Sequence, residues 1–139
     1  MITLATIACF VLLLLAFLHV YWAFGGLKGI SVVIPQDEQN QQLFEPGKWA
    51  TLFVAVCLFI SSLILGIEIG IIPFLQESRF VSILCFICFF VLCVRSIGDF
   101  KYVGLFKRRS CTTFSKMDTA IYTPLCLWLS FIFLYALIS

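Results

Sequence analysis

The sequence predicts an all-α protein, a four-helix bundle that crosses a membrane. Of its 139 residues, 63% are hydrophobic and only 12% are charged, and the mean hydropathy is +1.13. Uncharged stretches recur along the chain, each near the roughly 20 residues that a helix needs to cross the hydrocarbon of a bilayer. These stretches are apolar throughout and do not alternate as the strands of a membrane barrel do. Together these observations favour one transmembrane domain, residues 1–139, with helices at about 2–24, 49–72, 79–98 and 118–138.

The first two helices differ in what they carry besides apolar residues. The first has no Lys or Arg before its apolar run, so we expect a retained helix and not a secretory signal. The second places Ser62, Gly66 and Gly70 at intervals of four residues, a pattern that lets a neighbouring helix approach closely. Glu68 lies near the end of this helix, where it is able either to carry a proton or to reach water.

The third helix begins apolar and ends in a polar turn. Arg95 and Asp99 are one helical turn apart, and Asp99 at a helix C-terminus needs a cation, so their pairing is the simplest expectation. The chain has seven cysteines, and two of them form a C-x-x-C pair, Cys85 and Cys88, earlier in this helix. A thiol-exchange site needs accessible thiolates and usually a second dithiol, but the one loop cysteine, Cys111, has no nearby partner. We interpret the pair as packing residues near mid-membrane.

The fourth helix is expected to begin at Asp118, because a carboxylate at this position caps free amides and suits the helix dipole. Pro124 then falls inside the helix and predicts a kink. The charge distribution predicts the orientation. Seven cations flank the two long loops, whereas the short loop after the second helix holds only Arg79. The positive-inside rule therefore predicts cytoplasmic long loops and both termini outside.

Three blocks of this sequence resemble a known family. HVYWAFGGLKG at 19–29 with Pro35, RSIGDFKYVGLFKR at 95–108, and TTFSKMDTAIYTPLCL at 112–127 are similar to the signature blocks of the bacterial membrane proteins called the domain of unknown function 3995 family. The resemblance implies a small four-helix protein of a bacterial cytoplasmic (inner) membrane, without an assigned activity. It also implies that the family's motif positions fall at one membrane face, on His19, Tyr21, Trp22, Gly25, Gly26, Pro35, Arg95, Gly98, Asp99, Gly104, Lys107, Phe114, Asp118, Tyr122 and Pro124.

These residues leave three functions open. The first is a binding or assembly module for a membrane lipid, an apolar small molecule or a partner membrane protein, with a polar cluster at the cytoplasmic face and binding residues Tyr21, Trp22, Gly25, Gly26, Arg95 and Tyr122. The second is an intramembrane enzyme on a lipid, isoprenoid or quinone-like substrate, with His19 as acid or base and Asp99 or Asp118 orienting it. The third and weakest is a membrane thiol oxidoreductase that uses Cys85 and Cys88. The sequence predicts no metal site and no cofactor, and its net charge of +2 does not indicate nucleic-acid binding.

Overall fold

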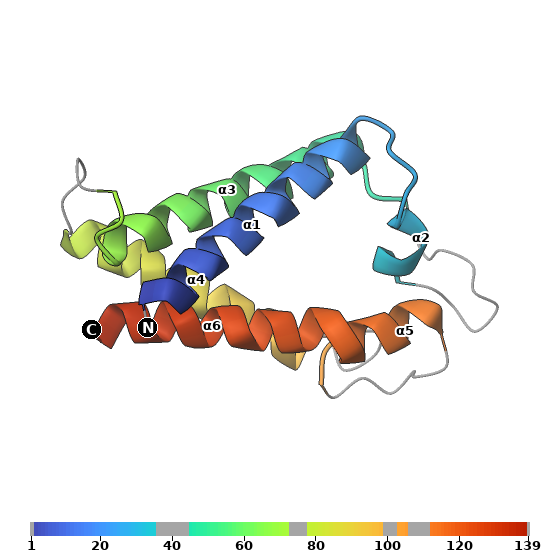
Figure 1. The fold of residues 1–139 in the computed structure, drawn as a ribbon. Helices are drawn as coiled ribbons and strands as arrows, with labels where there is room; N and C mark the ends of the chain where they lie inside the picture. Colours follow the sequence, from blue (N-terminus) through green and yellow to red (C-terminus); the bar gives the residue numbers. More distant parts are fainter. Residues whose placement is uncertain (1, 36–44, 73–77, 99–102, 106–111, 139) are drawn as a thin grey trace.

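The computed structural model describes residues 2–35, 45–72, 78–98, 103–105 and 112–138. Its elements are helical, and no strand occurs in these ranges. In chain order they are α1 (Ile2–Ala23), α2 (Ile30–Val33), α3 (Lys48–Glu68), α4 (Arg79–Ile97), α5 (Thr113–Met117), the π-helical turn η1 (Asp118–Tyr122) and α6 (Thr123–Ile138). Figure 1 shows α5, η1 and α6 running on as one long helix.

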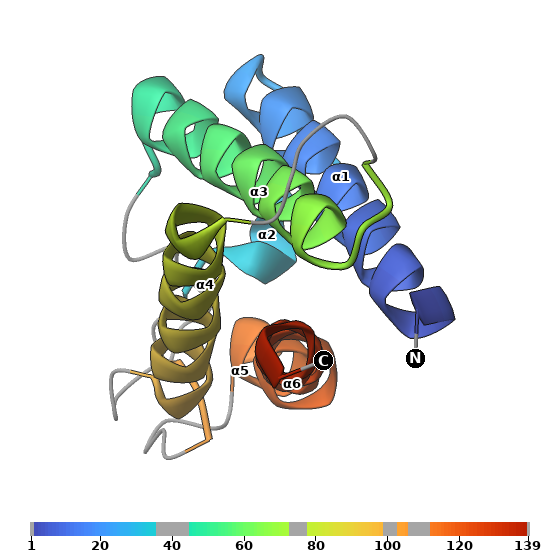
Figure 2. The same cartoon turned by 90° about the vertical axis from the view of Figure 1, so that its left-hand side faces the viewer.

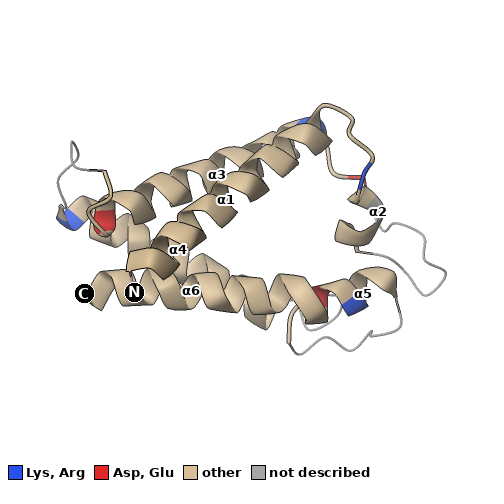
Figure 3. Ribbon diagram, in the orientation of Figure 1, with Lys and Arg blue, Asp and Glu red and all other residues tan. Residues whose placement is uncertain are grey.

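Four of these helices are long and apolar enough to cross a membrane: α1, α3, α4 and the continuous helix Thr113–Ile138. Figure 3 shows the charged residues of the described part of the chain gathered toward the two ends of the helices, with uncharged helix between them. Large apolar side chains such as Phe17, Phe86 and Phe90 are exposed on the outside of the bundle, where lipid is their natural solvent. The protein is therefore a multi-pass membrane protein, and the predicted four-helix fold is confirmed.

The four helices form two pairs that meet at one end and separate at the other. α1 packs mainly against α3, and α4 packs mainly against α6. Figures 1 and 2 show these pairs converging near the chain termini and diverging toward α2 and α5. We call the end that holds Ile2, Glu68 and Ile138 the narrow end. The end that holds α2 and the first turns of α3 and α5 is the wide end.

The hydrophobic core lies at the narrow end, where all four helices contribute to it. Small residues of α1 let the helices approach closely, and Ser62 of α3 donates a hydrogen bond of 3.0 Å to the carbonyl of Cys9. The buried cluster consists of Ala5, Ala8, Leu12, Ile64, Leu65, Cys85, Leu129, Ile132, Phe133 and Ala136.

Helix α3 ends at Glu68, before the predicted end at residue 72. Gly70 adopts a left-handed conformation (φ 71°), which residues with a side chain rarely adopt, and this reverses the chain. The amide of Ile71 then donates to the carbonyl of Gly66 at 2.9 Å, and this bond closes the last turn. Of the small residues predicted to form a packing stripe on this helix, Ser62 contacts α1. Gly70 lies beyond the end of the helix and is not part of the stripe.

The last membrane helix begins at Thr113 and not at Asp118. Thr112 caps it, because its side-chain oxygen accepts a 3.1 Å hydrogen bond from the amide of Ser115. Asp118 is therefore inside the helix, and the capping role expected for it is wrong. Near Pro124, where the sequence predicts a kink, the helix contains the π-helical turn η1, in which the amide of Thr123 donates to the carbonyl of Asp118 five residues earlier. Pro124 follows this turn directly, and a proline lacks an amide hydrogen and crowds the preceding turn, so the regular α-helical bonding cannot pass through it unchanged.

Candidate functional site

Two neighbouring cavities lie at the wide end of the bundle. The larger, about 670 Å³, lies among α1, α2, α3, α4, α5 and η1, and the smaller, about 340 Å³, lies among α1, α2 and α3. His19, Trp22 and Val54 line both. Arg95 and Tyr122 line the larger one only. Volumes of this size are typical of sites that hold a small molecule.

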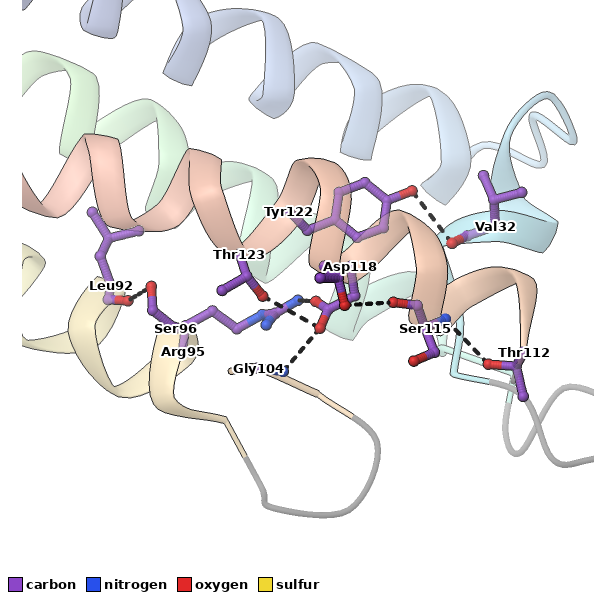
Figure 4. Close-up of polar contacts among 11 residues, drawn as sticks. Val32, Leu92, Arg95, Ser96, Gly104, Thr112, Ser115, Asp118, Tyr122 and Thr123 are labelled. Atoms are coloured by element: carbon purple, nitrogen blue, oxygen red, sulfur yellow. Dashed lines mark hydrogen bonds and ion pairs between the residues drawn. The ribbon is translucent and has the colours of Figure 1, made fainter. Parts of the chain in front are cut away.

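A part-buried ion pair joins α4 to η1 beside the larger cavity. Nη2 of Arg95 lies 3.0 Å from Oδ1 of Asp118, and the side chains are 36% and 0% exposed. The other carboxylate oxygen, Oδ2, accepts hydrogen bonds from the amide of Gly104 at 2.9 Å and from the hydroxyl of Thr123 at 3.3 Å. Figure 4 shows these donors converging on the one carboxylate. The buried charge of Asp118 is thus both paired and hydrogen-bonded, as burial of a charge requires.

Two glycines bring the Gly104 amide to this carboxylate. Gly98 (φ 82°) and Gly104 (φ 94°) are both left-handed, and their backbones lie against each other. A Cβ on Gly98 would collide with the carbonyl of Val103, and one on Gly104 would collide with the carbonyl of Ile97. The amide of Leu105 also donates to the carbonyl of Ser96 at 3.0 Å. Residues 98 and 104 thus form the neck of a loop whose closure depends on the absence of side chains at both positions.

His19 presents one free ring nitrogen at the wide end. Its Nδ1 lies 2.7 Å from the carbonyl oxygen of Leu15. A carbonyl only accepts, so Nδ1 carries the hydrogen of this bond, and in the neutral ring Nε2 is left as an acceptor. Within the described part of the chain, Nε2 has no hydrogen-bond partner. The ring of Trp22 meets the imidazole edge-on, with centroids 5.2 Å apart.

Helix α2 is held at the wide end by two aromatic side chains. The indole Nε1 of Trp22 donates to the carbonyl of Lys28 at 2.9 Å, just before α2. The hydroxyl of Tyr122 donates to the carbonyl of Val32 at 3.3 Å, which ties α2 to η1 (Figure 4). Because these bonds reach α2 from two different membrane helices, they fix it between the separated helix pairs.

Comparison with protein families gives one match, to the family described as "Protein of unknown function (DUF3995)", over residues 12–133. The match covers most of the chain. The chain belongs to this family. The resemblance inferred from the three sequence blocks is therefore confirmed. No curated protein and no solved structure gives a significant match.

The structure brings much of the predicted DUF3995 polar cluster together. His19, Trp22, Arg95 and Tyr122 line the larger cavity, and Asp118 lies behind Arg95. The partner that the structure gives Arg95 is Asp118 from the last helix, whereas Asp99, the partner expected from the sequence, lies outside the described residues, as does Cys111.

The expected orientation of His19 by Asp118 is not observed, since the imidazole hydrogen bond goes to the carbonyl of Leu15.

Tyr21, Gly25 and Gly26 shape the turn after α1, and none of them lines either cavity. The amide of Gly26 donates to the carbonyl of Tyr21 at 3.0 Å, and the Tyr21 ring occupies the space that a Cβ on Gly26 would fill. The hydroxyl of Tyr21 accepts from the amide of Lys28 at 3.4 Å. These residues set the path of the chain into α2 and so act on the site indirectly.

The sequence analysis missed the polar groups that complete the site. The Thr123 hydroxyl and the carbonyls of Leu15 and Val32 have no sequence signal, because they become partners only through the fold. Position 104 was available as a motif glycine, but its role as an amide donor to Asp118 depends on the neck of the loop. Helix α2, a single turn, is also too short to give a periodic pattern.

The C-x-x-C pair and Glu68 lie away from this site. Sγ of Cys85 lies 3.7 Å from the carbonyl of Phe133 on α6, while Sγ of Cys88 lies 3.4 Å from the hydroxyl of Ser61 on α3. The two thiols are free and contact different helices. At the narrow end, Oε2 of Glu68 is buried and has no hydrogen-bond partner among the described residues.

Proposed function

We propose that this protein is a binding module of the bacterial cytoplasmic membrane, and that it takes an amphipathic membrane molecule into the wide-end cavity. The observation that carries the proposal is the shape of this end: two helix pairs separate around about 670 Å³ of space instead of packing together. In lipid, helices associate through close packing, so a bundle that gives up packing at one end needs a compensating role for the space.

The chemistry of the lining supports an amphipathic ligand. Most of the wall is apolar, from residues such as Leu15, Leu18 and Val33, and it suits a hydrocarbon chain. The polar side chains are few: His19, Trp22, Arg95 and Tyr122, together with Lys28, which is exposed. A head group with one or two hydrogen-bonding atoms would satisfy this arrangement.

The proposal is tested by asking whether the purified protein keeps a bound amphiphile, and whether filling the cavity removes it. Val54 and Val56 are two residues apart on α3, but Val54 lines both cavities whereas Val56 lines neither. Val54→Trp should fill the space, and Val56→Trp should add the same bulk on the exposed outside of the helix. We expect mass spectrometry of gently purified protein to find a bound amphiphile in the wild type and in Val56→Trp, and to find it lost in Val54→Trp. Equal lipid content in all three proteins would refute the proposal.

The proposed orientation has both termini outside and the wide end in the cytoplasm. Three lysines belong to the wide end: Lys28 just before α2, Lys48 at the start of α3 and Lys116 in α5. Arg79 begins α4 at the narrow end. This distribution agrees with the cation excess of the long loops in the sequence. The test uses Lys28→Cys and Arg79→Cys, both at exposed positions, in a protein without its native cysteines. A membrane-impermeant thiol reagent should label Arg79→Cys in intact cells and Lys28→Cys only after permeabilisation. The reverse pattern would invert the topology.

A second candidate is an intramembrane enzyme with His19 as acid or base, favoured by the free Nε2 beside the cavity. The two functions differ in what happens to a bound amphiphile. A binding module returns it unchanged, whereas an enzyme converts it, and His19→Gln would abolish the conversion. Chemical analysis of the ligand recovered from wild type and His19→Gln after incubation separates them.

A further inference from the structure

We propose that the ligand of the larger cavity is an uncharged amphiphile whose head carries a hydroxyl group, and that this hydroxyl donates its hydrogen to Nε2 of His19. The inference rests on the proposed binding function and adds the chemical class of the head group. It follows from a count of the polar groups at the cavity wall and of the partners that each already has.

The free capacity near His19 is that of an acceptor. Nδ1 donates to the carbonyl of Leu15, which leaves Nε2 of the neutral ring with a lone pair and no partner in the described part of the chain. The contact with Trp22 and the hydrogen bond to Leu15 hold the ring in place, and the ring lines both cavities. A ligand that donates a hydrogen bond is the natural complement.

The aromatic donors of the cavity wall are already used. The indole hydrogen of Trp22 goes to the carbonyl of Lys28, and the hydroxyl hydrogen of Tyr122 goes to the carbonyl of Val32. The Tyr122 oxygen retains the capacity to accept a second hydrogen bond. His19 on α1 and Tyr122 on η1 therefore each offer a hydrogen-bond acceptor to a ligand.

Two cations line the larger cavity, Lys28 and Arg95. Lys28 is exposed, so solvent screens its charge. The charge of the part-buried Arg95 is already balanced. Arg95 pairs with Asp118 at 3.0 Å, and Asp118 is 0% exposed, so the pair carries no net charge into the cavity. An anionic head, such as a phosphate, would add a negative charge beside a buried carboxylate in a region of low dielectric. The remaining donor of the guanidinium, Nη1, is buried and has no partner among the described residues. A neutral hydroxyl oxygen would satisfy it without adding charge.

A series of probes with one tail and three heads tests this inference. Geranylgeraniol offers a hydroxyl, its methyl ether keeps the oxygen but cannot donate, and geranylgeranyl monophosphate is anionic. Each is titrated against the full-length protein in nanodiscs of neutral lipid, with Val54→Trp as the blocked control. We expect the alcohol to bind about tenfold tighter than the ether, the effect of one hydrogen bond in a buried site. His19→Phe should lower the affinity for the alcohol to that for the ether and leave the ether unchanged.

The outcomes separate the inference from the function on which it rests. If the phosphate binds tightest, the cavity presents positive charge, and the neutral-head inference is wrong while the binding function stands. If alcohol and ether bind equally in the wild type, Nε2 does not accept a hydrogen bond from the ligand. The hydroxyl inference is then wrong, while the binding function stands. If no probe binds the wild type better than Val54→Trp, the binding function itself fails for amphiphiles of this tail. If His19→Phe weakens the ether as much as the alcohol, His19 acts through packing and the proposed hydrogen bond is refuted.

Discussion

At the narrow end of the bundle the helices meet through small and apolar side chains, whereas at the wide end they are joined by polar contacts around a cavity. The core cluster and the Ser62 to Cys9 hydrogen bond belong to the first region. The Arg95–Asp118 pair and the Tyr122 to Val32 hydrogen bond belong to the second. Lipid supplies no hydrophobic force between helices, so close packing must hold the first region. Where a cavity removes packing, buried polar contacts take over, and each of them fixes a different element at the site.

If polar contacts hold the wide end together, the largest loss of stability should come from breaking the Arg95–Asp118 ion pair. Arg95→Met leaves Asp118 charged, buried and without its cation, and should lower the free energy of unfolding by about 3 kcal/mol. Adding Asp118→Asn should recover most of the loss, because it removes the charge and keeps an oxygen that accepts from Gly104 and Thr123. Unfolding in mixed micelles with increasing SDS measures both.

The matched control for this prediction is Arg79→Met, an exposed arginine at the narrow end, which should change stability little. Additive losses for Arg95→Met and Asp118→Asn would mean that the two side chains are not coupled. In that case the Arg95–Asp118 contact would not stabilise the wide end of the bundle.

The next effect concerns two glycines, Gly104 and Gly70, that both have a positive φ but differ in their surroundings. Gly104→Ala should cost about 2 kcal/mol or more, since a Cβ there is strained and collides with the carbonyl of Ile97. Gly70→Ala at the narrow end is equally left-handed but has nothing within 4 Å of the added atom, so we expect about 1 kcal/mol. The same SDS titration compares them. Equal losses would show that the neck between Gly98 and Gly104 is not tightly packed.

The fold could be predicted from the sequence because membrane helices are set by length and local composition. A run such as residues 2–23 needs only apolar residues and no charge to be recognised as a span. The helix ends were harder. The left-handed turn at Gly70 and the cap at Thr112 depend on single residues, and a carboxylate such as Asp118 looks the same in sequence whether it caps a helix or is buried inside one.

The candidate site was predictable in its members but not in its contacts. Motif positions placed His19, Arg95, Asp118 and Tyr122 at one membrane face, and the structure gathers them around one cavity. Which cation pairs with which carboxylate was beyond the sequence, because Asp118 is remote from Arg95 along the chain and is brought to it only by the packing of α4 against α6. The two separated helix pairs, and hence the cavity itself, leave no local pattern.

A smaller effect is expected for the polar contact of the narrow end. Ser62→Ala removes the 3.0 Å bond between α3 and the Cys9 carbonyl of α1, and should cost about 0.6 kcal/mol, the average for hydrogen bonds between membrane helices. Ser130 is equally buried, at 5% exposed, but donates to Leu127 of its own helix. Ser130→Ala should therefore cost less than Ser62→Ala in SDS titration. A loss above about 2 kcal/mol for Ser62→Ala would mean that the narrow end also depends on polar contacts.

The smallest effect is expected for the C-x-x-C pair, which lies in and beside the narrow-end core. Replacing Cys85 and Cys88 together with Ser should change the free energy of unfolding by about 0.5 kcal/mol or less, because a serine hydroxyl can make the same contacts to Phe133 and Ser61. Since the two thiols contact different helices, mild oxidation of the wild type should not form a disulfide between them. Mass spectrometry after alkylation, with and without oxidant, measures this directly. A disulfide between these positions, formed readily and reversed by a quinol or dithiol, would instead support the thiol oxidoreductase hypothesis and move the functional site to the narrow end.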